Sequence, residues 1–451
     1  MIAIGVSVAI VSVLAASAAF AEEPPRYKFE VGQEIGYRSD SASKFGSGEK
    51  AGTFLNTIDY TVWVVRKNEN DTWRLVIRQV TESKRLDHEG KERVDSRAPQ
   101  YAYCDIAADG TFVHNETLQF LNVSWLFPRL PPAADHRIWG ARYDWDQTEL
   151  RYRRDENQPE GNLRFREFRR TMLDPVYGFK WDTVYDFGHK EGLLVTAEQK
   201  FEQSVGFVGE GTETWALMHV KQHEPTWARQ LADDSQRFFS VRQGDRGIVN
   251  AIARQPSQAR ELVAEAKSAM EVLLETCKSA EVQAMCTRHL DYLKSSEEYY
   301  FDQAANLAKL LDQPAPPWET TDWDGKKHSL ADYRGKVVLL EFWYRGCGWC
   351  IRAMPQIKQL QAEFKDQPVA ILGMCEDDEE ENARFVVDYL NIEYPTLKSD
   401  GIQQKYGDGG WPTLVLIDQQ GTVRRIHIGY SPTLRDELGA ETRALLAKSK
   451  D

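Results

Sequence analysis

The first half of the chain carries short runs of β-branched and aromatic residues separated by polar stretches. Thr57–Val65 and Trp73–Arg78 are two such runs, and similar ones recur at Gly192–Ala197 and Thr212–Val220. Runs of this composition and length are typical of β-strands, and the polar residues between them favour turns. We therefore predict a β-rich antiparallel N-terminal domain over residues 26–225, built as one sheet or as a sandwich.

The spacing of hydrophobic positions becomes helical further along the chain. Ala, Glu, Leu and Lys dominate the stretch from about 257 to 311. Its apolar residues recur at the spacing of one helical face, among them Leu262, Ala266 and Leu273,. This pattern predicts a helical hairpin or connector over residues 256–312.

Cys277 and Cys286 lie within this predicted connector. On one unbroken helix they would be about 13 Å apart along the axis and on different faces, too far for a disulfide. A turn near residues 278–281 would bring them together. Three interpretations stay open: a structural disulfide between two helices, two buried free thiols, or a second redox pair.

Beyond Gln313 the pattern alternates between strand-like and helix-like segments. The buried strands that we predict cover residues 336–342, 368–374, 413–417 and 423–428, and the helices cover residues 350–364, 380–390 and 433–447. Such alternation is typical of an α/β domain whose central sheet is covered on both faces. We place this domain at residues 313–450, so the fold class is multidomain.

Length and charge limit the functional classes. A chain of 451 residues is too long for one ordinary core,. The formal net charge of -13 argues against a nucleic-acid-binding protein, which usually presents a basic face,. The nine histidines show no metal-binding spacing, so no metal site is predicted.

The N-terminal segment indicates the compartment. Residues 1–21 carry no charge and end in Ala19-Phe20-Ala21, the small-x-small pattern of a signal-peptide cleavage site,. An apolar run of about 20 residues can also span a bilayer, so the segment is either a signal peptide or a retained anchor. We therefore expect an exported protein, periplasmic or in the cell envelope, where disulfides can persist.

The sequence Cys347-Gly348-Trp349-Cys350 follows a predicted buried strand and opens a predicted helix. A helix N-terminus offers unpaired N–H groups and the positive end of the helix dipole, which stabilise a thiolate at Cys347. The thiolate is the species that attacks a disulfide. We therefore predict that Cys347 attacks and that Cys350, one turn further along, resolves the mixed disulfide.

The C-terminal domain resembles the thioredoxin superfamily, and more narrowly the exported TlpA/ResA-like thiol-disulfide oxidoreductases. The segments that carry the resemblance are Ala315–Trp318, Gly335–Trp343, Cys347–Cys350 with Pro355, and Gly410–Thr413. The resemblance implies a thioredoxin fold and no cofactor beyond the redox-active cysteine pair. It also implies protein disulfide or dithiol clients and a membrane or periplasmic electron donor. Trp349 replaces the proline of thioredoxin itself, so the direction of electron flow stays open, with reductase as the family expectation.

The resemblance implies further site residues. Pro412 corresponds to the cis proline that faces the cysteine pair, and Trp411 before it would offer backbone groups to a client peptide; packing is the alternative role of Trp411. Trp349 would also contact the client. Glu341 stands where thioredoxins carry a buried Asp, and burial would raise its pKa so that it could take the proton of Cys350. A solvated or salt-bridged Glu341 is the alternative.

Three functional hypotheses follow. The first is an exported thiol-disulfide oxidoreductase acting on protein disulfides. The second is a peroxiredoxin-like peroxidase, which needs a threonine three residues before its cysteine; Tyr344 stands there. The third is a non-enzymatic envelope binding or scaffold module with a redox-inert cysteine pair. Cys104 and Cys375 are expected to be buried thiols.

Overall fold

This computed structural model describes residues 23–46, 51–115, 125–143, 148–170, 178–204, 208–242, 245–377, 380–407 and 410–448. The segment predicted as a signal peptide or anchor, residues 1–21, lies outside the described residues. Within the described ranges, no helix has both the length and the apolar character needed to cross a membrane.

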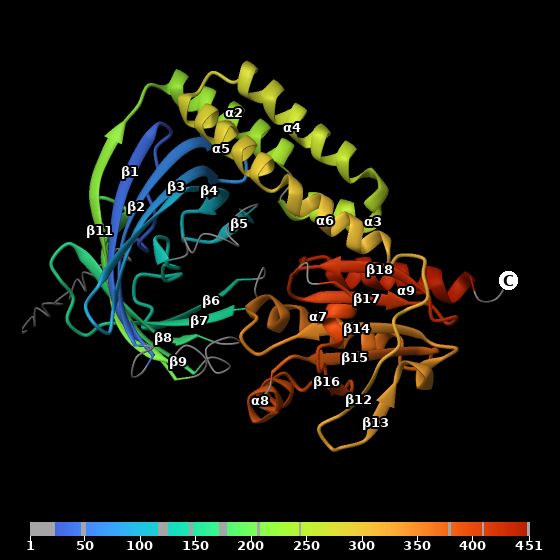
Figure 1. Cartoon of the computed structure of the whole chain (residues 1–451). Coiled ribbons are helices and arrows are strands. Elements are labelled where there is room, and N and C mark those ends of the chain that lie inside the picture. The colour runs from blue at the N-terminus through green and yellow to red at the C-terminus, as the bar shows by residue number, and fades with distance from the viewer. Residues whose placement is uncertain are drawn as a thin grey trace, which may run out of the picture.

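The N-terminal region forms one antiparallel sheet of eleven strands, in the order β5-β4-β3-β2-β1-β11-β10-β9-β8-β7-β6. The strands are β1 Gln33–Phe45, β2 Gly52–Lys67, β3 Thr72–Asp87, β4 Glu92–Ala107, β5 Phe112–Asn115, β6 Ile138–Tyr143, β7 Thr148–Arg154, β8 Asn162–Arg170, β9 Phe179–Gly188, β10 Leu193–Gln203 and β11 Gly209–Gln222. Figure 1 shows that the sheet curves strongly around its own inner face. Of the two predicted arrangements, the structure therefore has the single sheet.

Side-chain alternation gives this sheet two apolar faces where helices cover it. Along β2, Val62 and Val64 point into the core enclosed by the curved sheet, together with Phe187 and other rings. Trp63 and Val65, the residues between and after them, belong to a second core formed with the helices. One strand thus contributes to two cores because successive side chains point to opposite faces.

Five helices connect the sheet to the C-terminal domain (Figure 1). They are α2 Pro225–Arg242, α3 Asp245–Arg254, α4 Ala259–Thr276, α5 Ala280–Ser295 and α6 Glu297–Ala308. Helix α2 packs against the sheet through Leu231, Phe238 and Phe239. Helical structure therefore begins directly after β11, well before residue 256, where the sequence pattern first indicated it.

Of the three interpretations of Cys277 and Cys286, the structure has two buried free thiols and not the possible structural disulfide. The turn between α4 and α5 brings the two thiols into hydrogen-bonding contact, but neither is disulfide-bonded. Both are buried, and burial raises the pKa of Cys277 and raises that of Cys286 to about 12. The hairpin is held instead by packing and by Asp234, whose carboxylate accepts hydrogen bonds from the backbone N–H groups of Lys278 and Ser279.

The C-terminal domain contains a five-stranded sheet in the order β16-β15-β14-β17-β18. Its strands are β14 Val337–Trp343, β15 Val369–Cys375, β16 Thr396–Lys398, β17 Thr413–Ile417 and β18 Val423–Ile428, and its helices are α7 Gly348–Glu363, α8 Glu380–Leu390 and α9 Leu434–Lys448. A short hairpin precedes the sheet, with β12 Glu319–Thr321 and β13 Lys327–Ser329. Strands β14 and β15 are parallel, whereas β17 and β18 are antiparallel to their neighbours.

Both faces of this sheet are covered, but by different parts of the chain. On one face, Leu339 and Trp343 of β14 pack with residues of α7 and α9. On the other face, Leu340 and Phe342 share a core with Tyr300 of α6 and with residues of α3 and α4. The connector helices are therefore part of the C-terminal domain's packing.

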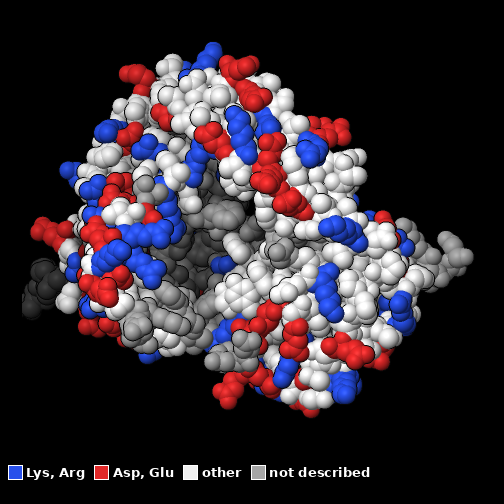
Figure 2. All heavy atoms as spheres, in the orientation of Figure 1, with Lys and Arg blue, Asp and Glu red and all other residues white. Residues whose placement is uncertain are grey.

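The two sheets border a common recess. Figure 2 shows a deep hollow in the middle of the molecule, with the curved sheet on its left, the connector helices above it and the C-terminal domain on its right. Lys, Arg, Asp and Glu side chains of both signs are scattered over the visible surface around the hollow. The connector helices therefore run above this hollow from the large sheet to the C-terminal domain.

Candidate active site

Cys347 and Cys350 are joined by a disulfide, with their Cα atoms 5.2 Å apart. Cys347 is the N-cap residue of α7, and its sulfur accepts a hydrogen bond of 3.0 Å from the backbone N–H of Cys350. Cys347 is 5% exposed and Cys350 is fully buried. The cysteine at the helix N-terminus, where a thiolate is stabilised, is therefore also the more exposed residue of the two,.

Trp411 and Pro412 lie in the loop before β17, and the peptide bond between them is cis. Pro412 is buried, whereas Trp411 is half-buried and packs against the cores on both faces of the sheet. Tyr344, three residues before Cys347, meets the Trp411 ring edge-on with 5.0 Å between ring centroids. Trp411 therefore packs as the alternative interpretation expected, and its loop also borders the segment that leads to Cys347.

Trp349, between the two cysteines, is half-buried and packs against side chains that include Tyr430 and Arg352. Its ring stacks on Tyr430 with 5.5 Å between centroids, and the Arg352 guanidinium lies 4.7 Å from its centroid. Aromatic stacking and cation–π contacts of this kind restrict the indole. The segment after β18, which carries Tyr430, thus reaches the cysteine pair.

Glu341 lies in the middle of β14 and is fully buried. Its Oε2 accepts a hydrogen bond of 2.6 Å from the hydroxyl of Tyr394, and its Oε1 has no partner among the described residues. Burial raises the pKa of Glu341 to about 8, and the Tyr394 hydrogen bond opposes part of that rise. The solvated or salt-bridged alternative for Glu341 is therefore wrong.

The position of Glu341 follows from strand alternation. Leu339 and Trp343, two residues away on either side, pack in the same cluster as Cys350. Residues i and i+2 of a strand share a face, so the Glu341 carboxyl points to the side of the sheet that α7 covers. A carboxyl with a raised pKa thus lies on the face of the sheet that is covered by the helix carrying Cys350.

Asp377, Arg345 and Cys375 form a hydrogen-bonded group that the sequence did not predict. Asp377 accepts a hydrogen bond of 2.7 Å from the backbone N–H of Arg345 and one of 3.4 Å from the Cys375 thiol. Burial raises the pKa of Cys375, and the same holds for Cys104 in the large sheet. Both cysteines are buried thiols, as predicted.

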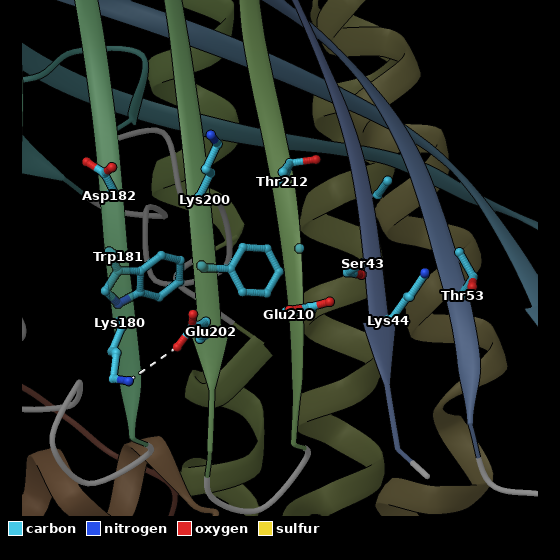
Figure 3. Close-up of a pocket in the computed structure, with 13 residues that line it drawn as sticks. Ser43, Lys44, Thr53, Lys180, Trp181, Asp182, Lys200, Glu202, Glu210 and Thr212 are labelled. Atoms are coloured by element: carbon cyan, nitrogen blue, oxygen red, sulfur yellow. Dashed lines mark hydrogen bonds and ion pairs between the residues drawn. The ribbon is translucent and has the colours of Figure 1, made fainter. Parts of the chain in front are cut away.

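A separate pocket of about 520 Å³ lies on the large sheet, across β2, β1, β11, β10 and β9 (Figure 3). Charged side chains of both signs line it, including the ion pair of Lys180 and Glu202 at 3.3 Å. None of the predicted site residues contributes to it.

In the parts of the chain that the structure describes, no group of three His, Cys, Asp or Glu side chains is placed to hold a metal ion.

Known proteins are similar to the C-terminal part of this chain. Residues 311–426 match the AhpC/TSA family. The thiol-disulfide oxidoreductase ResA of Geobacillus thermodenitrificans is 34% identical over 124 residues, which are 27% of this chain and 71% of that protein. The thioredoxin-like protein YneN of Bacillus subtilis is 33% identical over 120 residues, 26% of this chain and 71% of that protein. The thioredoxin domain of a thiol-disulfide oxidoreductase from Bacteroides vulgatus covers 30% of this chain and 97% of its own, at 25% identity and a TM-score of 0.28.

Proposed function

Because this chain belongs, through its C-terminal domain, to the family of thiol-disulfide oxidoreductases that includes ResA, we propose that it exchanges electrons with protein disulfides through Cys347 and Cys350. The observation that carries the proposal is the placement of Cys347. Its sulfur caps the N-terminus of α7 and is bonded to that of Cys350, and Cys347 is the more exposed residue of the two. That environment lowers the pKa of a thiol and favours its attack on a disulfide.

The reaction proceeds through a mixed disulfide. In the reduced protein, the Cys347 thiolate attacks one sulfur of a client disulfide, and the other client sulfur leaves as a thiolate. Cys350 then loses its proton to Glu341 and attacks the Cys347 sulfur, which releases the second client thiolate. The client disulfide gains two electrons, and the Cys347–Cys350 disulfide forms.

We further propose the direction and the compartment. The chain works as a disulfide reductase outside the cytoplasm, since residues 1–21 have the composition of an export signal or anchor,. A membrane or periplasmic dithiol donor returns two electrons to the Cys347–Cys350 disulfide after each turnover. No cofactor other than the cysteine pair takes part.

The side chain of Tyr344, three residues before Cys347, disfavours the peroxidase alternative. Tyr344 occupies the position where the peroxidase hypothesis needs a threonine, and its ring is engaged by Trp411. A match to the AhpC/TSA family does not by itself distinguish the two activities. The scaffold alternative requires that the disulfide is never exchanged.

Insulin reduction by dithiothreitol tests the proposal. The wild-type protein is expected to accelerate the reaction, and Cys347→Ser is expected to abolish the acceleration. Cys375→Ser, which removes a buried thiol of the same domain, is the matched control and should stay active. Coinciding traces for wild type and Cys347→Ser would rule out the oxidoreductase, and consumption of peroxide with no insulin reduction would favour the peroxidase.

A Cys350→Ser variant can identify the clients. Without the resolving thiol, the mixed disulfide between Cys347 and a client should persist. Mass spectrometry of adducts captured from an envelope extract would name the client proteins. Recovery of small-molecule adducts alone would contradict protein clients.

A further inference from the structure

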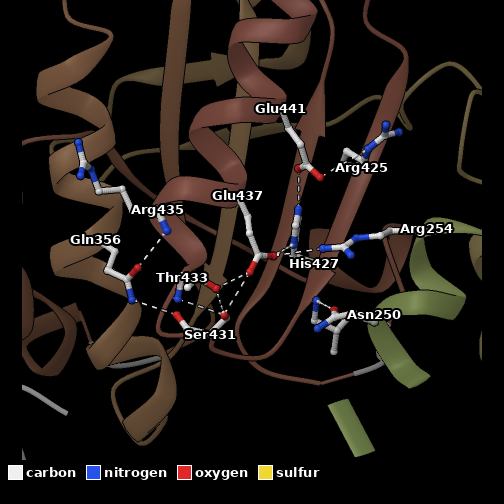
Figure 4. A network of polar contacts seen from close by, with 11 residues as sticks. Asn250, Arg254, Gln356, Arg425, His427, Ser431, Thr433, Arg435, Glu437 and Glu441 are labelled. Atoms are coloured by element: carbon white, nitrogen blue, oxygen red, sulfur yellow. Dashed lines mark hydrogen bonds and ion pairs between the residues drawn. The ribbon is translucent and has the colours of Figure 1, made fainter. Parts of the chain in front are cut away.

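Helix α3 of the connector lies against the edge strand of the redox domain. The Asn250 side-chain oxygen accepts a hydrogen bond of 3.4 Å from the backbone N–H of Ile428, the last residue of β18. Ile252 of the same helix is 1% exposed and shares a core with Ile426 and Ile428. Figure 4 shows α3 beside the end of β18, with Asn250 and Arg254 directed towards it. Helix α3 thus fixes the point at which the chain leaves the sheet.

Arg254 of α3 fixes the next part of the chain indirectly. It forms an ion pair of 3.2 Å with Glu437 of α9. The other oxygen of Glu437 accepts hydrogen bonds from the hydroxyls of Thr433, at 2.6 Å, and Ser431, at 3.3 Å. Figure 4 shows this network around Glu437, with the buried His427 beside it. Helix α3 therefore acts on both ends of the segment 428–433, which we call the β18–α9 segment.

The β18–α9 segment contacts the redox site at three points. The backbone N–H of Gly429 donates a hydrogen bond of 2.8 Å to the carbonyl oxygen of Pro412. The Tyr430 ring stacks on Trp349, between the two cysteines. The Ser431 carbonyl oxygen accepts a hydrogen bond of 3.0 Å from Gln356 of α7. The segment therefore links the loop before β17 to the helix that carries the cysteine pair.

We propose that α3 is a positioning element for client docking. Asn250 and Arg254 set the place of the β18–α9 segment, and that segment sets the Trp411–Pro412 loop and the Trp349 ring that a client polypeptide meets. The inference rests on the proposed function and adds residues to it that lie outside the part of the chain matched by the AhpC/TSA family, residues 311–426. Docking on the redox domain thus depends on the connector.

The proposal separates docking from chemistry. Asn250 and Arg254 contact neither cysteine in any described interaction, so the intrinsic reactivity of Cys347 should not depend on them. A protein client uses the surface around the pair, whereas a small disulfide such as oxidised dithiothreitol needs only the sulfur. Loss of the α3 contacts should therefore raise KM for protein clients and leave small-disulfide kinetics unchanged.

The test uses the full chain with the double variant Asn250→Leu and Arg254→Met. KM for insulin is expected to rise about fivefold, the size expected for one weak hydrogen bond and one exposed ion pair, with kcat within about twofold. The conservative pair Asn250→Asp and Arg254→Lys keeps an acceptor and a positive charge and should restore KM. Arg66→Met removes a comparable exposed ion pair, with Asp233 at 2.9 Å, at the far end of the connector and is the control.

Hydrogen exchange supplies a readout that does not depend on activity. The amides of Ile428 and Gly429 should exchange about fivefold faster in the double variant than in the Arg66→Met control. Unchanged exchange, an unchanged KM, or an equal loss of rate towards insulin and the small disulfide would each overturn the role of α3. A wild-type protein that does not reduce insulin would refute the proposed function, and with it the inference about α3. A wild-type protein that reduces insulin, together with a double variant whose kinetics are unchanged, would refute the inference about α3 alone.

Discussion

Replacement of Glu341 by Gln should change how the stability of the protein depends on pH. The carboxyl of Glu341 is fully buried, and its pKa rises from 4.5 to about 8, first because burial removes its hydration. The folded protein therefore holds this proton more tightly than the unfolded chain does. The contribution of Glu341 to stability is fully present below pH 4.5 and is lost as the pH rises through 8,.

The size of the effect follows from the two pKa values. Each unit of difference between the folded and unfolded pKa corresponds to about 1.4 kcal/mol, so the rise to about 8 amounts to roughly 5 kcal/mol as an upper bound,. Glutamine does not ionise, and its side-chain oxygen can still accept the hydrogen bond from Tyr394. The difference in unfolding free energy between wild type and Glu341→Gln should therefore change across pH 5 to 8 in favour of the variant.

Urea unfolding of the oxidised full-length protein and its variant, at half-unit steps from pH 5 to pH 8.5, measures this difference. Subtraction of the two curves cancels the other titrating groups, which both proteins share. Glu319→Gln, at an exposed position on β12, is the control for a general effect of removing one carboxylate. If the difference between wild type and Glu341→Gln is the same at pH 5 and pH 8, the pKa of the buried carboxyl is not raised in the folded protein.

Three further predictions concern the neighbourhood of the pair and the connector. Tyr394→Phe removes the hydrogen bond that lowers the pKa of Glu341, so the pH profile of kcat should move to higher pH, and a shift to lower pH would contradict this. Iodoacetamide should modify Cys347 of the reduced native protein within minutes and leave Cys104, Cys277, Cys286 and Cys375 unmodified until urea is added, as peptide mass spectrometry can show, since burial raises the pKa of all four thiols. Leu273→Ala should cost about 2–5 kcal/mol of unfolding free energy in urea titrations because Leu273 is 2% exposed, whereas Val272→Ala, at 56% exposed, should cost under about 0.5; equal costs would refute the role of this core,.

The strands of the redox domain could be predicted closely because each is a short buried run with turn residues at both ends. Thr413–Ile417 and Val423–Ile428 form strands with the predicted bounds. Helices α2 and α3 were missed, since their apolar faces are recognisable only once their partners are known. Phe238 and Phe239 of α2, for example, pack on a sheet whose contacting residue Trp63 lies far away in the sequence.

Only those parts of the site that lie in recognisable local sequence segments could be predicted. Cys347 and Cys350 were placed by their spacing after a predicted strand, whereas Glu341 was placed by the resemblance to thioredoxins, which carry a buried Asp at that position. Tyr394 was not identified because its hydrogen bond to Glu341 joins residues 53 positions apart. The state of Cys277 and Cys286 was open for a related reason: sequence spacing shows that a turn can bring two thiols together, but not whether they are bonded.

Helix α4 contributes residues both to a core of the redox domain and to a core against the large sheet. Val263, near its start, belongs to the core on one face of the redox sheet, whereas Met270 and Leu273 belong to the core against the large sheet. Ten residues of helix separate Val263 from Leu273, a distance of about 15 Å along the helix axis. Leu340 and Phe342, which flank Glu341 on β14, point into the same core as Val263. The connector therefore packs on the face of β14 opposite to the one towards which Glu341 points.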